Sequence, residues 1–319
     1  MRLKCMKSNF ADRLLDAIDR KRNPSVIGLD TDVSRVPPRL VEEARARRGD
    51  GHEAAAESML GFNKAVIDAI RDIVPAVKLQ SAFYERHGPS GQEAFLRTAE
   101  HAKSRGLVVI GDVKRGDIGS TSAAYADAYL GPFELFGRMQ EAYGLDAVTV
   151  NPYMGSDGVK PFIESAAGSG RGVFVLVRTS NPSASEIQDL VSGKRKVYEA
   201  VAGLVDGWGS GLVGERGYSP VGAVVGATCP KEAEILRRRM PRAIFLVPGY
   251  GAQGGTAADI APCFAKDGRG ALVHSARAVI FAYEKSVKPE DFTEAARTAA
   301  IRMRDEICAS LKAAGKLPW

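Results

Sequence analysis

Eight short, largely apolar runs alternate with longer amphipathic stretches along the chain. The runs span residues 25–29, 76–80, 107–112, 147–151, 173–177, 221–226, 243–247 and 271–274. They are bounded by glycine, proline or polar residues, and several are almost wholly apolar, which is typical of parallel strands covered on both faces. Helical periodicity fills the intervals, for example at 59–73, 92–104, 196–208 and 231–239. Eight such units in 319 residues predict a parallel (β/α)8 barrel, the TIM barrel.

The start of the chain favours a closed barrel over an open sheet. An open, doubly wound sheet is the alternative, but it usually has fewer strands and a glycine fingerprint after the first. Here the first run ends in Gly28-Leu29-Asp30-Thr31-Asp32, which lacks the G-x-G-x-x-G spacing. We therefore expect one α/β domain over residues 1–319, with the barrel core at about 20–290.

Both ends of the chain have the pattern of terminal packing helices. Phe10, Leu14 and Ile18 recur every four residues, which suits a helix that closes the bottom of the barrel. Residues 292–311 have the pattern of a final outer helix. Two stretches have the composition of surface insertions: 36–51 and 183–195.

Charge and hydropathy argue against several classes of protein. The 44 Lys and Arg exceed the 38 Asp and Glu by six, but they are dispersed, whereas nucleic-acid binders usually concentrate them. No apolar run approaches the ~18 residues of a membrane span, and the first residues lack the apolar core of a signal peptide. The four cysteines show neither C-x-x-C nor C-x-x-H spacing, so we expect reduced thiols. These observations predict a cytoplasmic protein that binds neither nucleic acid nor membranes.

The third apolar run leads into a charged segment at one end of the predicted barrel. Because side chains alternate along a strand, Asp112 and Lys114 are expected to face the barrel mouth, where the active sites of such barrels lie. Lys78 reaches the same rim from the preceding strand, and Asp117 and Thr121 lie one helical turn apart. The structural alternative is a surface ion pair between Asp112 and Lys114, with Asp117 as a helix cap.

The charged segment resembles a known family. Residues 112–121, D-V-K-R-G-D-I-G-S-T, resemble the D-x-K-R-x-D-I-x-x-T signature of orotidine 5′-phosphate decarboxylases. Four shorter segments agree: G-L-D at 28–30, V-K-L-Q at 77–80, V-P-G-Y-G-A-Q-G-G at 247–255 and H-S-A-R at 274–277. The T-V-N-P-Y-M-G and V-R-T-S-N-P segments, with the insertions, resemble the larger bacterial branch. The resemblance implies decarboxylation of orotidine 5′-monophosphate (OMP) to uridine 5′-monophosphate (UMP) in de novo pyrimidine biosynthesis, without a metal or an organic cofactor.

The chemistry of that reaction explains why such residues are wanted. Loss of CO2 from C6 of orotate leaves a carbanion that the ring π system cannot delocalise, so its stabilisation must be electrostatic. An ammonium beside C6 serves first as counter-charge and then as general acid, and we assign that role to Lys114. Asp112 would lie near the departing carboxylate, and we expect it both to repel that group and to position Lys114. With Lys78 and Asp117, these residues would form an alternating array with no net charge.

The resemblance also implies the remaining contacts. Asp117 and Thr121 match residues that come from the partner subunit, which implies a homodimer with shared active sites. Asp30 and Lys78 match residues that bind the ribose hydroxyls, and Ser180 is our candidate for the pyrimidine amide edge, with a plain turn residue as its alternative. The phosphate is expected after the seventh and eighth strands, at Pro248, Gln253, Gly254, Ala276 and Arg277, with a flexible loop and a surface arginine as the alternative.

Other functions stay open on the residues alone. A magnesium-dependent sugar-phosphate decarboxylase or aldolase of the same barrel group shares a D-x-K-x-x-D pattern, and Glu85 is available for its metal. Arg115, Ile118 and Thr121 favour the nucleotide enzyme over it. The other alternative is a catalytically silent phosphate-binding barrel or a nucleic-acid-associated protein. The intact Lys78, Asp112, Lys114 and Asp117 argue against a silent barrel, and the dispersed basic residues argue against nucleic acid. His274 is expected to pack rather than to react.

Overall fold

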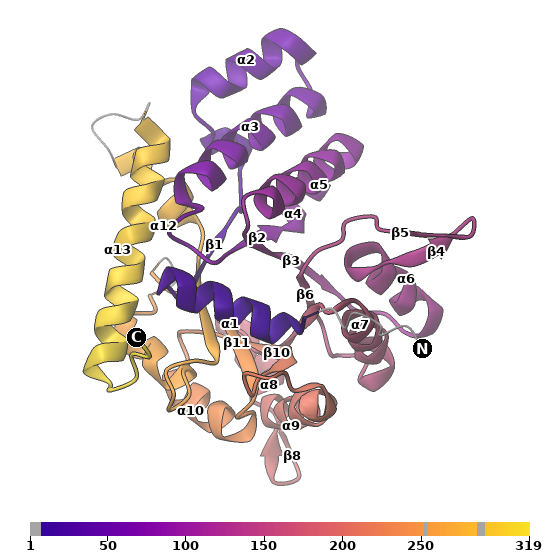
Figure 1. The fold of residues 1–319 in the computed structure, drawn as a ribbon, viewed down its shortest axis with the longest axis vertical. Helices are drawn as coiled ribbons and strands as arrows, with labels where there is room; N and C mark the ends of the chain where they lie inside the picture. Colours follow the sequence, from indigo (N-terminus) through magenta and orange to yellow (C-terminus); the bar gives the residue numbers. More distant parts are fainter. Residues whose placement is uncertain (1–7, 252–253, 286–290) are drawn as a thin grey trace.

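Eight parallel strands close into a barrel in the computed structural model, which describes residues 8–251, 254–285 and 291–319 (Figure 1). The order around the barrel is β1, β2, β3, β6, β7, β10, β11 and β12, and β12 pairs with β1. The strands are Ser25–Gly28 (β1), Ala76–Gln80 (β2), Val108–Arg115 (β3), Ala147–Val150 (β6), Gly172–Arg178 (β7), Ser219–Val225 (β10), Ala243–Val247 (β11) and Ala271–Ser275 (β12). Each overlaps one of the predicted apolar runs. The (β/α)8 barrel is therefore confirmed, and the open sheet is wrong.

Helices surround the barrel and bury their apolar stripes against the strands (Figure 1). In α3, for example, Phe62, Val66 and Ile70 repeat every four residues and are fully buried. The longer outer helices are His52–Ile70 (α3), Gly88–Ser104 (α5), Gly119–Leu130 (α6), Ser156–Ser169 (α7), Val197–Gly209 (α9), Pro230–Arg239 (α10) and Phe292–Ala313 (α13). Shorter helices are Ser81–Glu85 (α4), Ser185–Gln188 (α8), Ala257–Ile260 (α11) and Arg277–Ile280 (α12).

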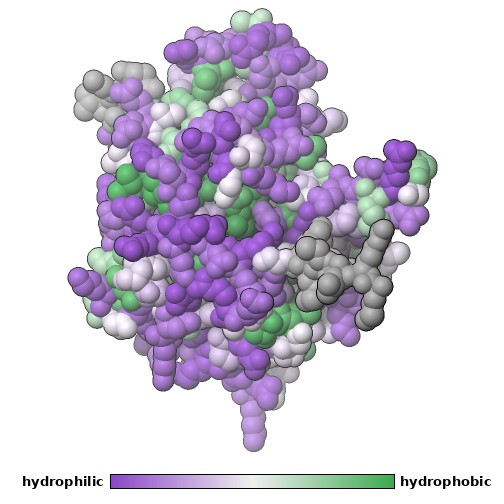
Figure 2. All heavy atoms as spheres, viewed as in Figure 1, coloured by the Kyte–Doolittle hydropathy of each residue, from purple (hydrophilic) through white to green (hydrophobic). Residues whose placement is uncertain are grey.

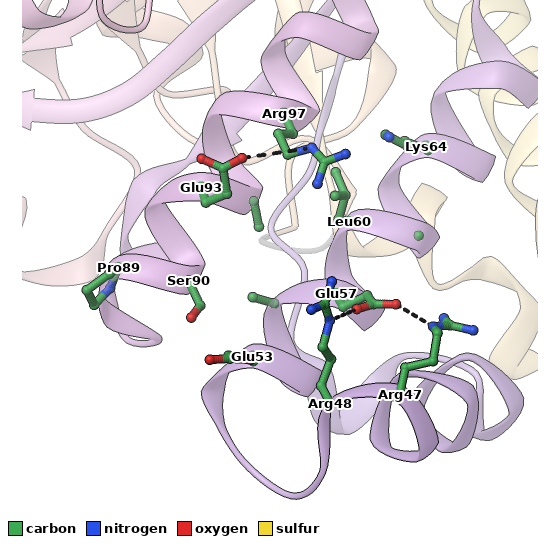
Figure 3. Close-up of a pocket in the computed structure, with 13 residues that line it drawn as sticks. Arg47, Arg48, Glu53, Glu57, Leu60, Lys64, Pro89, Ser90, Glu93 and Arg97 are labelled. Carbon is green, nitrogen blue, oxygen red and sulfur yellow. Dashed lines mark hydrogen bonds and ion pairs between the residues drawn. The ribbon is translucent and has the colours of Figure 1, made fainter.

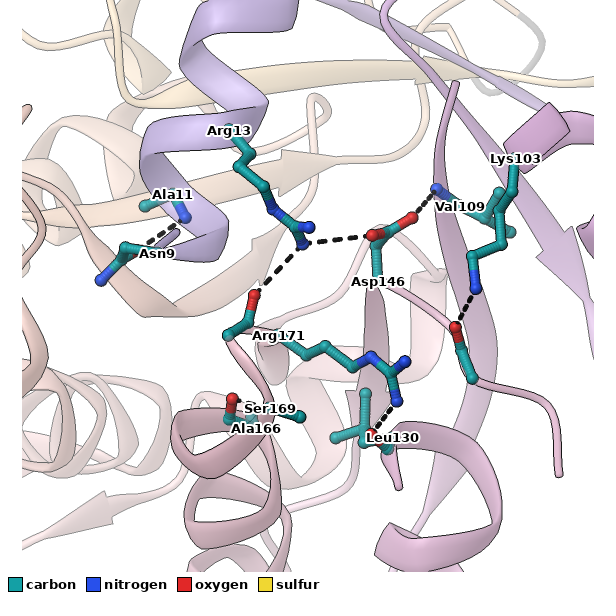
Figure 4. Close-up of polar contacts among 12 residues, drawn as sticks. Asn9, Ala11, Arg13, Lys103, Val109, Leu130, Asp146, Ala166, Ser169 and Arg171 are labelled. Atoms are coloured by element: carbon teal, nitrogen blue, oxygen red, sulfur yellow. Dashed lines mark hydrogen bonds and ion pairs between the residues drawn. The ribbon is translucent and has the colours of Figure 1, made fainter. Parts of the chain in front are cut away.

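The first helix, Phe10–Lys21 (α1), closes the end of the barrel opposite the strand carboxyl ends, as predicted. The Phe10 ring meets Phe174 edge-on at 5.9 Å and occupies the space that a β-carbon at Gly172 would need. Figure 4 shows how polar contacts fix the same helix: Arg13 Nη2 lies 3.1 Å from Asp146 Oδ1 and 3.1 Å from the carbonyl oxygen of Gly170. The barrel therefore has one sealed end and one open end.

The segments between the barrel units form small elements of their own. Residues of the first predicted insertion fold as a helix, Pro38–Arg48 (α2), that packs on α3. The second insertion holds α8 and a short hairpin, Val191–Ser192 (β8) with Arg195–Lys196 (β9). A further hairpin, Phe133–Leu135 (β4) with Arg138–Gln140 (β5), projects from the barrel on the side of α6 and α7 (Figure 1). Neither hairpin was predicted from the sequence.

The outer surface agrees with the dispersed charge of the sequence. Figure 2 shows one face on which hydrophilic side chains dominate and hydrophobic areas are small and scattered. Within the ranges that the structure describes, no helix combines the length and the hydropathy that crossing a membrane requires.

Candidate active site

A cavity of about 510 Å³ opens at the carboxyl ends of the barrel strands. Every barrel strand, or the turn directly after it, contributes to its lining, as expected for an active site on this fold. The charged and hydrogen-bonding lining residues include Asp30, Lys78, Gln80, Asp112, Lys114, Thr149, Thr179, Ser180, Asn181, Gln188, His274, Ser275 and Arg277. Leu176, Val224, Leu246, Pro248, Gly249, Tyr250 and Ala276 complete the lining.

The Asp112 carboxylate lies at the centre of the polar wall. Lys78 Nζ donates to its Oδ2 at 2.7 Å, and Lys114 Nζ donates to its Oδ1 at 2.5 Å. Gln80 Nε2 and Thr149 Oγ1 each donate to the same carboxylate at 2.9 Å. All four donors come from β2, β3 and β6, which are neighbours in the barrel. The carboxylate is therefore held on both oxygens.

Asp112 and Lys78 keep each other charged despite their burial. Burial raises the pKa of Asp112, but Lys78 and Lys114 oppose it, and the resulting pKa is well below the usual aspartate range. Burial lowers the pKa of Lys78, but Asp112 and Asp30 raise it above the usual lysine value. Asp30 Oδ1 lies 3.5 Å from Lys78 Nζ. Lys114 is less enclosed, with 45% of its side chain exposed, so its ammonium is available to a ligand.

The end of β3 departs from a regular strand. Gly111 pairs with Val148 and Arg115 pairs with Val150, so three residues of β3 lie opposite the single residue Thr149 of β6. Within this bulge Lys114 has a φ of +45°, in the left-handed region that non-glycine residues rarely adopt. We predicted that simple alternation would bring Asp112 and Lys114 to one face. The structure brings both into one cavity through this bulge.

One wall of the cavity is made by the glycine-rich segment after β11 and by the start of α12. Pro248, Gly249 and Tyr250 line it, together with Ala276 and the exposed Arg277. Gly249 has a φ of +97°, a conformation that favours glycine. Of the two remaining predicted residues, Gly254 lies in the described part of this segment but does not line the cavity, and Gln253 lies outside the described residues.

A further wall follows β7, which β10 separates from β11, and includes a contribution from the second insertion. Ser180 packs so closely on Gly226 that a β-carbon there would lie 2.9 Å from the Ser180 β-carbon. Gln188 of α8 reaches this wall, where its Nε2 donates to Thr179 Oγ1 at 2.7 Å and its Oε1 accepts from Thr179 N at 3.0 Å. Gln188 was not among the predicted site residues, because no motif marks which residue of an insertion folds back.

Besides Gly254, two further predicted site residues, Asp117 and Thr121, lie outside this cavity. Asp117 Oδ1 accepts a hydrogen bond from the Ile118 backbone at the start of α6, and Thr121 is exposed on that helix. Neither residue lines the cavity with Lys78, Asp112 and Lys114.

His274 is buried in the cavity floor. Burial and the nearby Lys78 lower its pKa to about 3, so the ring is neutral at physiological pH. Its Nε2 has no hydrogen-bond partner among the described residues. Gly28 makes room for the ring, because any side chain at that position would collide with it. The expected packing role agrees with this burial, but the ring also borders the site.

The magnesium-dependent alternative would use Glu85 as a metal ligand. Glu85 does not face the cavity; it forms an ion pair and hydrogen bond with Arg115, whose guanidinium also donates to Tyr129. Across residues 8–251, 254–285 and 291–319, no three His, Cys, Asp or Glu side chains are grouped suitably for a metal ion.

A second hollow lies away from the strand ends, between α2, α3 and α5 (Figure 3). It encloses about 760 Å³. Several of its charged side chains form ion pairs: Arg47 and Arg48 both lie 2.6 Å from Glu57, and Arg97 lies 3.9 Å from Glu93. These ion pairs lie on exposed or half-exposed side chains, unlike the buried Lys78–Asp112 pair at the barrel mouth.

Comparisons with known proteins agree on one family. The family model for orotidine 5′-phosphate decarboxylase / HUMPS matches residues 59–291. An orotidine 5′-phosphate decarboxylase of Caldicellulosiruptor saccharolyticus is 38% identical over 303 residues, which cover 95% of this chain and 99% of the relative. One of Rhodopirellula baltica is 41% identical over 303 residues, covering 93% and 98%. The solved OMP decarboxylase of Leishmania donovani aligns with a TM-score of 0.71 at 29% identity, covering 95% of this chain and 98% of that one.

Proposed function

The chain belongs to the orotidine 5′-phosphate decarboxylase / HUMPS family, and from that premise we propose how its barrel cavity acts on its substrate. The protein is a carboxy-lyase that converts OMP to UMP in pyrimidine biosynthesis. The observation that carries the assignment of the site is the Lys78–Asp112–Lys114 network at the strand ends.

Lys114 is the proton donor in this proposal. Departure of CO2 leaves an electron pair at C6 that no π system accepts, so the positive charge must already be in place. The Lys114 ammonium supplies that charge and then transfers a proton to C6, which yields UMP. Its partly exposed side chain supports this role, because the ammonium reaches the open part of the cavity.

Asp112 acts on the substrate carboxylate and on Lys114. Two like charges at ~4 Å and an effective dielectric near 20 repel by about 4 kcal/mol, equivalent to roughly 10³ in rate if the repulsion is relieved in the transition state. Hydrogen bonds to both oxygens oppose rotation of the Asp112 carboxylate away from the substrate. Lys78 balances its charge from the buried side. We infer a mixed role of repulsion and positioning.

The remaining contacts hold the ribose and the pyrimidine in the cavity and the phosphate at the glycine-rich segment and the start of α12. Asp30 and Lys78 bind the ribose hydroxyls, and Ser180 reads the amide edge of the pyrimidine. The phosphate binds at Pro248, Gln253, Gly254, Ala276 and Arg277. The positions of Asp30, Ser180 and Arg277 in the lining of one cavity support this division.

We further propose that the enzyme is a homodimer in which Asp117 and Thr121 complete the partner's site. Their place outside their own cavity supports this arrangement. So do the exposed apolar side chains near Asp117, among them Ile118, Tyr153 (83% exposed) and Met154. Large apolar side chains exposed together mark protein interfaces more often than free surface.

The β4–β5 hairpin carries further exposed apolar side chains on the side of α6 and α7. Phe136 at its turn is 95% exposed and Met139 is 62% exposed, and Figure 1 shows the hairpin on the side of α6 and α7. A second copy of this chain is the partner that would cover these side chains. We also propose that the enzyme acts in the cytoplasm; the free thiols of Cys229, Cys263 and Cys308 support a reducing compartment.

The proposal is tested by following the loss of OMP absorbance with purified protein, with and without EDTA. We expect equal turnover in both, because Lys114 supplies the positive charge that a metal supplies in the sugar-phosphate alternative. Turnover that is lost in EDTA and restored by magnesium would promote that alternative. Binding of UMP without any decarboxylation of OMP would favour the catalytically silent barrel instead.

A further inference from the structure

The bulge at the end of β3 leaves the backbone of Lys114 without a regular strand partner. Three residues of β3 lie opposite Thr149, so the ladder between β3 and β6 is interrupted where the catalytic lysine stands. Lys114 also has a φ of +45°. A non-glycine residue keeps such a conformation only where its surroundings hold it, and such positions cluster at functional sites.

Thr149 fills the gap in the ladder with its side chain. Its Oγ1 accepts a hydrogen bond from the Lys114 backbone N–H at 3.0 Å. The same hydroxyl donates to Asp112 Oδ1 at 2.9 Å, and this oxygen also accepts from Lys114 Nζ. Thr149 is 1% exposed, so its hydroxyl makes these contacts in a buried position. One hydroxyl therefore joins the backbone of the lysine to the carboxylate that holds its ammonium.

We propose that Thr149 is a positioning residue for decarboxylation. Its hydroxyl holds Lys114 in the left-handed conformation and directs Asp112 Oδ1 toward the ammonium. This inference rests on the proposed function, because it gives Thr149 a role only through Lys114 and Asp112. The hydroxyl both accepts and donates, and both of its partners are fixed by the fold. Valine has the same shape and can do neither.

Two pairs of variants isolate the oxygen atom. Thr149→Val removes the hydroxyl at nearly constant volume, and Thr149→Ser keeps the hydroxyl while removing the methyl group. Thr149→Ala and Thr149→Ser form a second pair that differs by the same oxygen. Thr98→Val is the matched control, because Thr98 is also fully buried but lies on α5, away from the cavity. Each variant is assayed for OMP turnover, for UMP binding by calorimetry and for thermal unfolding.

The expected result is a loss in kcat that follows the hydroxyl. Misplacing a reacting group by about 1 Å can cost ~10²-fold, so we expect kcat to fall by roughly 30- to 100-fold in Thr149→Val. The kcat values of Thr149→Ser and Thr98→Val should stay within about threefold of wild type. The UMP affinity of every variant should also stay within about threefold, because UMP does not need the proton donor in its reactive position. If Thr149→Val does not fold, the same comparison is made between Thr149→Ala and Thr149→Ser.

Several outcomes would overturn the inference. Hydroxyl-free variants with wild-type kcat would do so, as would a Thr149→Ser variant as impaired as its hydroxyl-free counterpart. Equal losses in kcat and UMP affinity would show that Thr149 only supports the cavity. A wild-type protein that does not decarboxylate OMP would overturn the function and this inference together, whereas an active wild type with an equally active Thr149→Val would overturn the inference alone.

Discussion

The charge of each residue at the barrel mouth depends on two opposing effects on its pKa: burial favours the neutral form, and a neighbouring opposite charge favours the ionised form. Asp112 has a pKa below the usual range, so its stabilising contribution is present above pH ~4 and is lost as the pH falls toward its folded pKa. Lys78 has a raised pKa, so its contribution is present below pH ~10.4 and is lost as the pH rises through its folded pKa. The ion pair is therefore maintained throughout the neutral range.

His274 makes stability depend on pH for a different reason: it is buried as a neutral group, whereas Asp112 and Lys78 are buried as an ion pair. Its pKa is lowered to about 3, so below pH ~6.5 His274 becomes protonated in the unfolded chain but stays neutral in the folded protein. Stability from this residue is present above pH ~6.5 and declines as the pH falls. Between pH 7 and pH 5 we expect the free energy of unfolding to fall by about 2 kcal/mol more in wild type than in His274→Gln. Urea unfolding at the two pH values measures this difference, and identical losses would show that the ring is not buried as a neutral group.

Substitution of Arg277 tests whether the phosphate binds at the cavity wall formed by the glycine-rich segment and the start of α12. The phosphate is remote from C6, and binding energy from remote groups lowers the barrier at the reacting centre. Arg277→Ala should lower kcat/KM for OMP by ~10²-fold, about 2.7 kcal/mol. Arg302→Ala is the matched control, since Arg302 lines a neighbouring hollow with Arg277 but not the cavity. Equal kcat/KM values for wild type and Arg277→Ala would mean that the phosphate binds elsewhere.

At the scale of elements, the sequence predicted what depends on local pattern. The barrel strands are buried on both faces, so their apolar runs stand out without tertiary information. The β4–β5 hairpin was missed because each of its strands has three residues, too few for an alternating pattern. The bulge that places Lys114 was missed because it depends on the register of β3 against β6. The role of Thr149 follows from that register and was missed for the same reason.

Arg237 shows how one buried side chain joins several elements. It lies on α10, and its guanidinium donates to the carbonyl oxygens of Cys263, Met240, Ala243 and Gly270 while stacking 3.6 Å from the centre of the Phe245 ring. Burial lowers its pKa to about 10, which still leaves it charged.

Removing this guanidinium takes a donor from four carbonyl oxygens, of which those of Gly270 and Met240 keep a backbone N–H donor. Arg237→Met should therefore lower the free energy of unfolding by about 3 kcal/mol. Arg238→Met is the control, because Arg238 lies on the same helix, is exposed and pairs only with Glu234 among the described residues. Its substitution should lower the free energy of unfolding by about 0.5 kcal/mol or less. Urea unfolding of the two variants compares them directly. Equal costs would contradict the anchoring role of Arg237.

For the whole molecule, the proposed dimer predicts that two inactive variants regain activity when their subunits exchange, which a monomeric enzyme would not do. If Asp117 serves the partner's site and Lys114 serves its own, Lys114→Ala and Asp117→Ala homodimers are each severely impaired. In a mixed dimer, one site regains both residues and the other site lacks both. Random re-association makes half of the dimers mixed, so about a quarter of all sites should recover activity.

Subunit exchange must be shown independently, for example by mass-tagged chains, because a dimer that never dissociates would also stay inactive. With exchange demonstrated, activity that does not return would place Asp117 in its own subunit's site and refute the shared interface. The exposed apolar side chains at Ile118, Tyr153 and Phe136 would then need another partner.

The central claim is that Lys114 delivers the charge and the proton at C6, and one comparison tests it most directly. Single-turnover decarboxylation of OMP is measured for wild type and Lys114→Ala, with UMP binding measured on the same samples. The account predicts rapid conversion by wild type and a loss of at least ~10⁴-fold in Lys114→Ala, with UMP affinity within about tenfold. Conversion by Lys114→Ala within tenfold of the wild-type rate would contradict it.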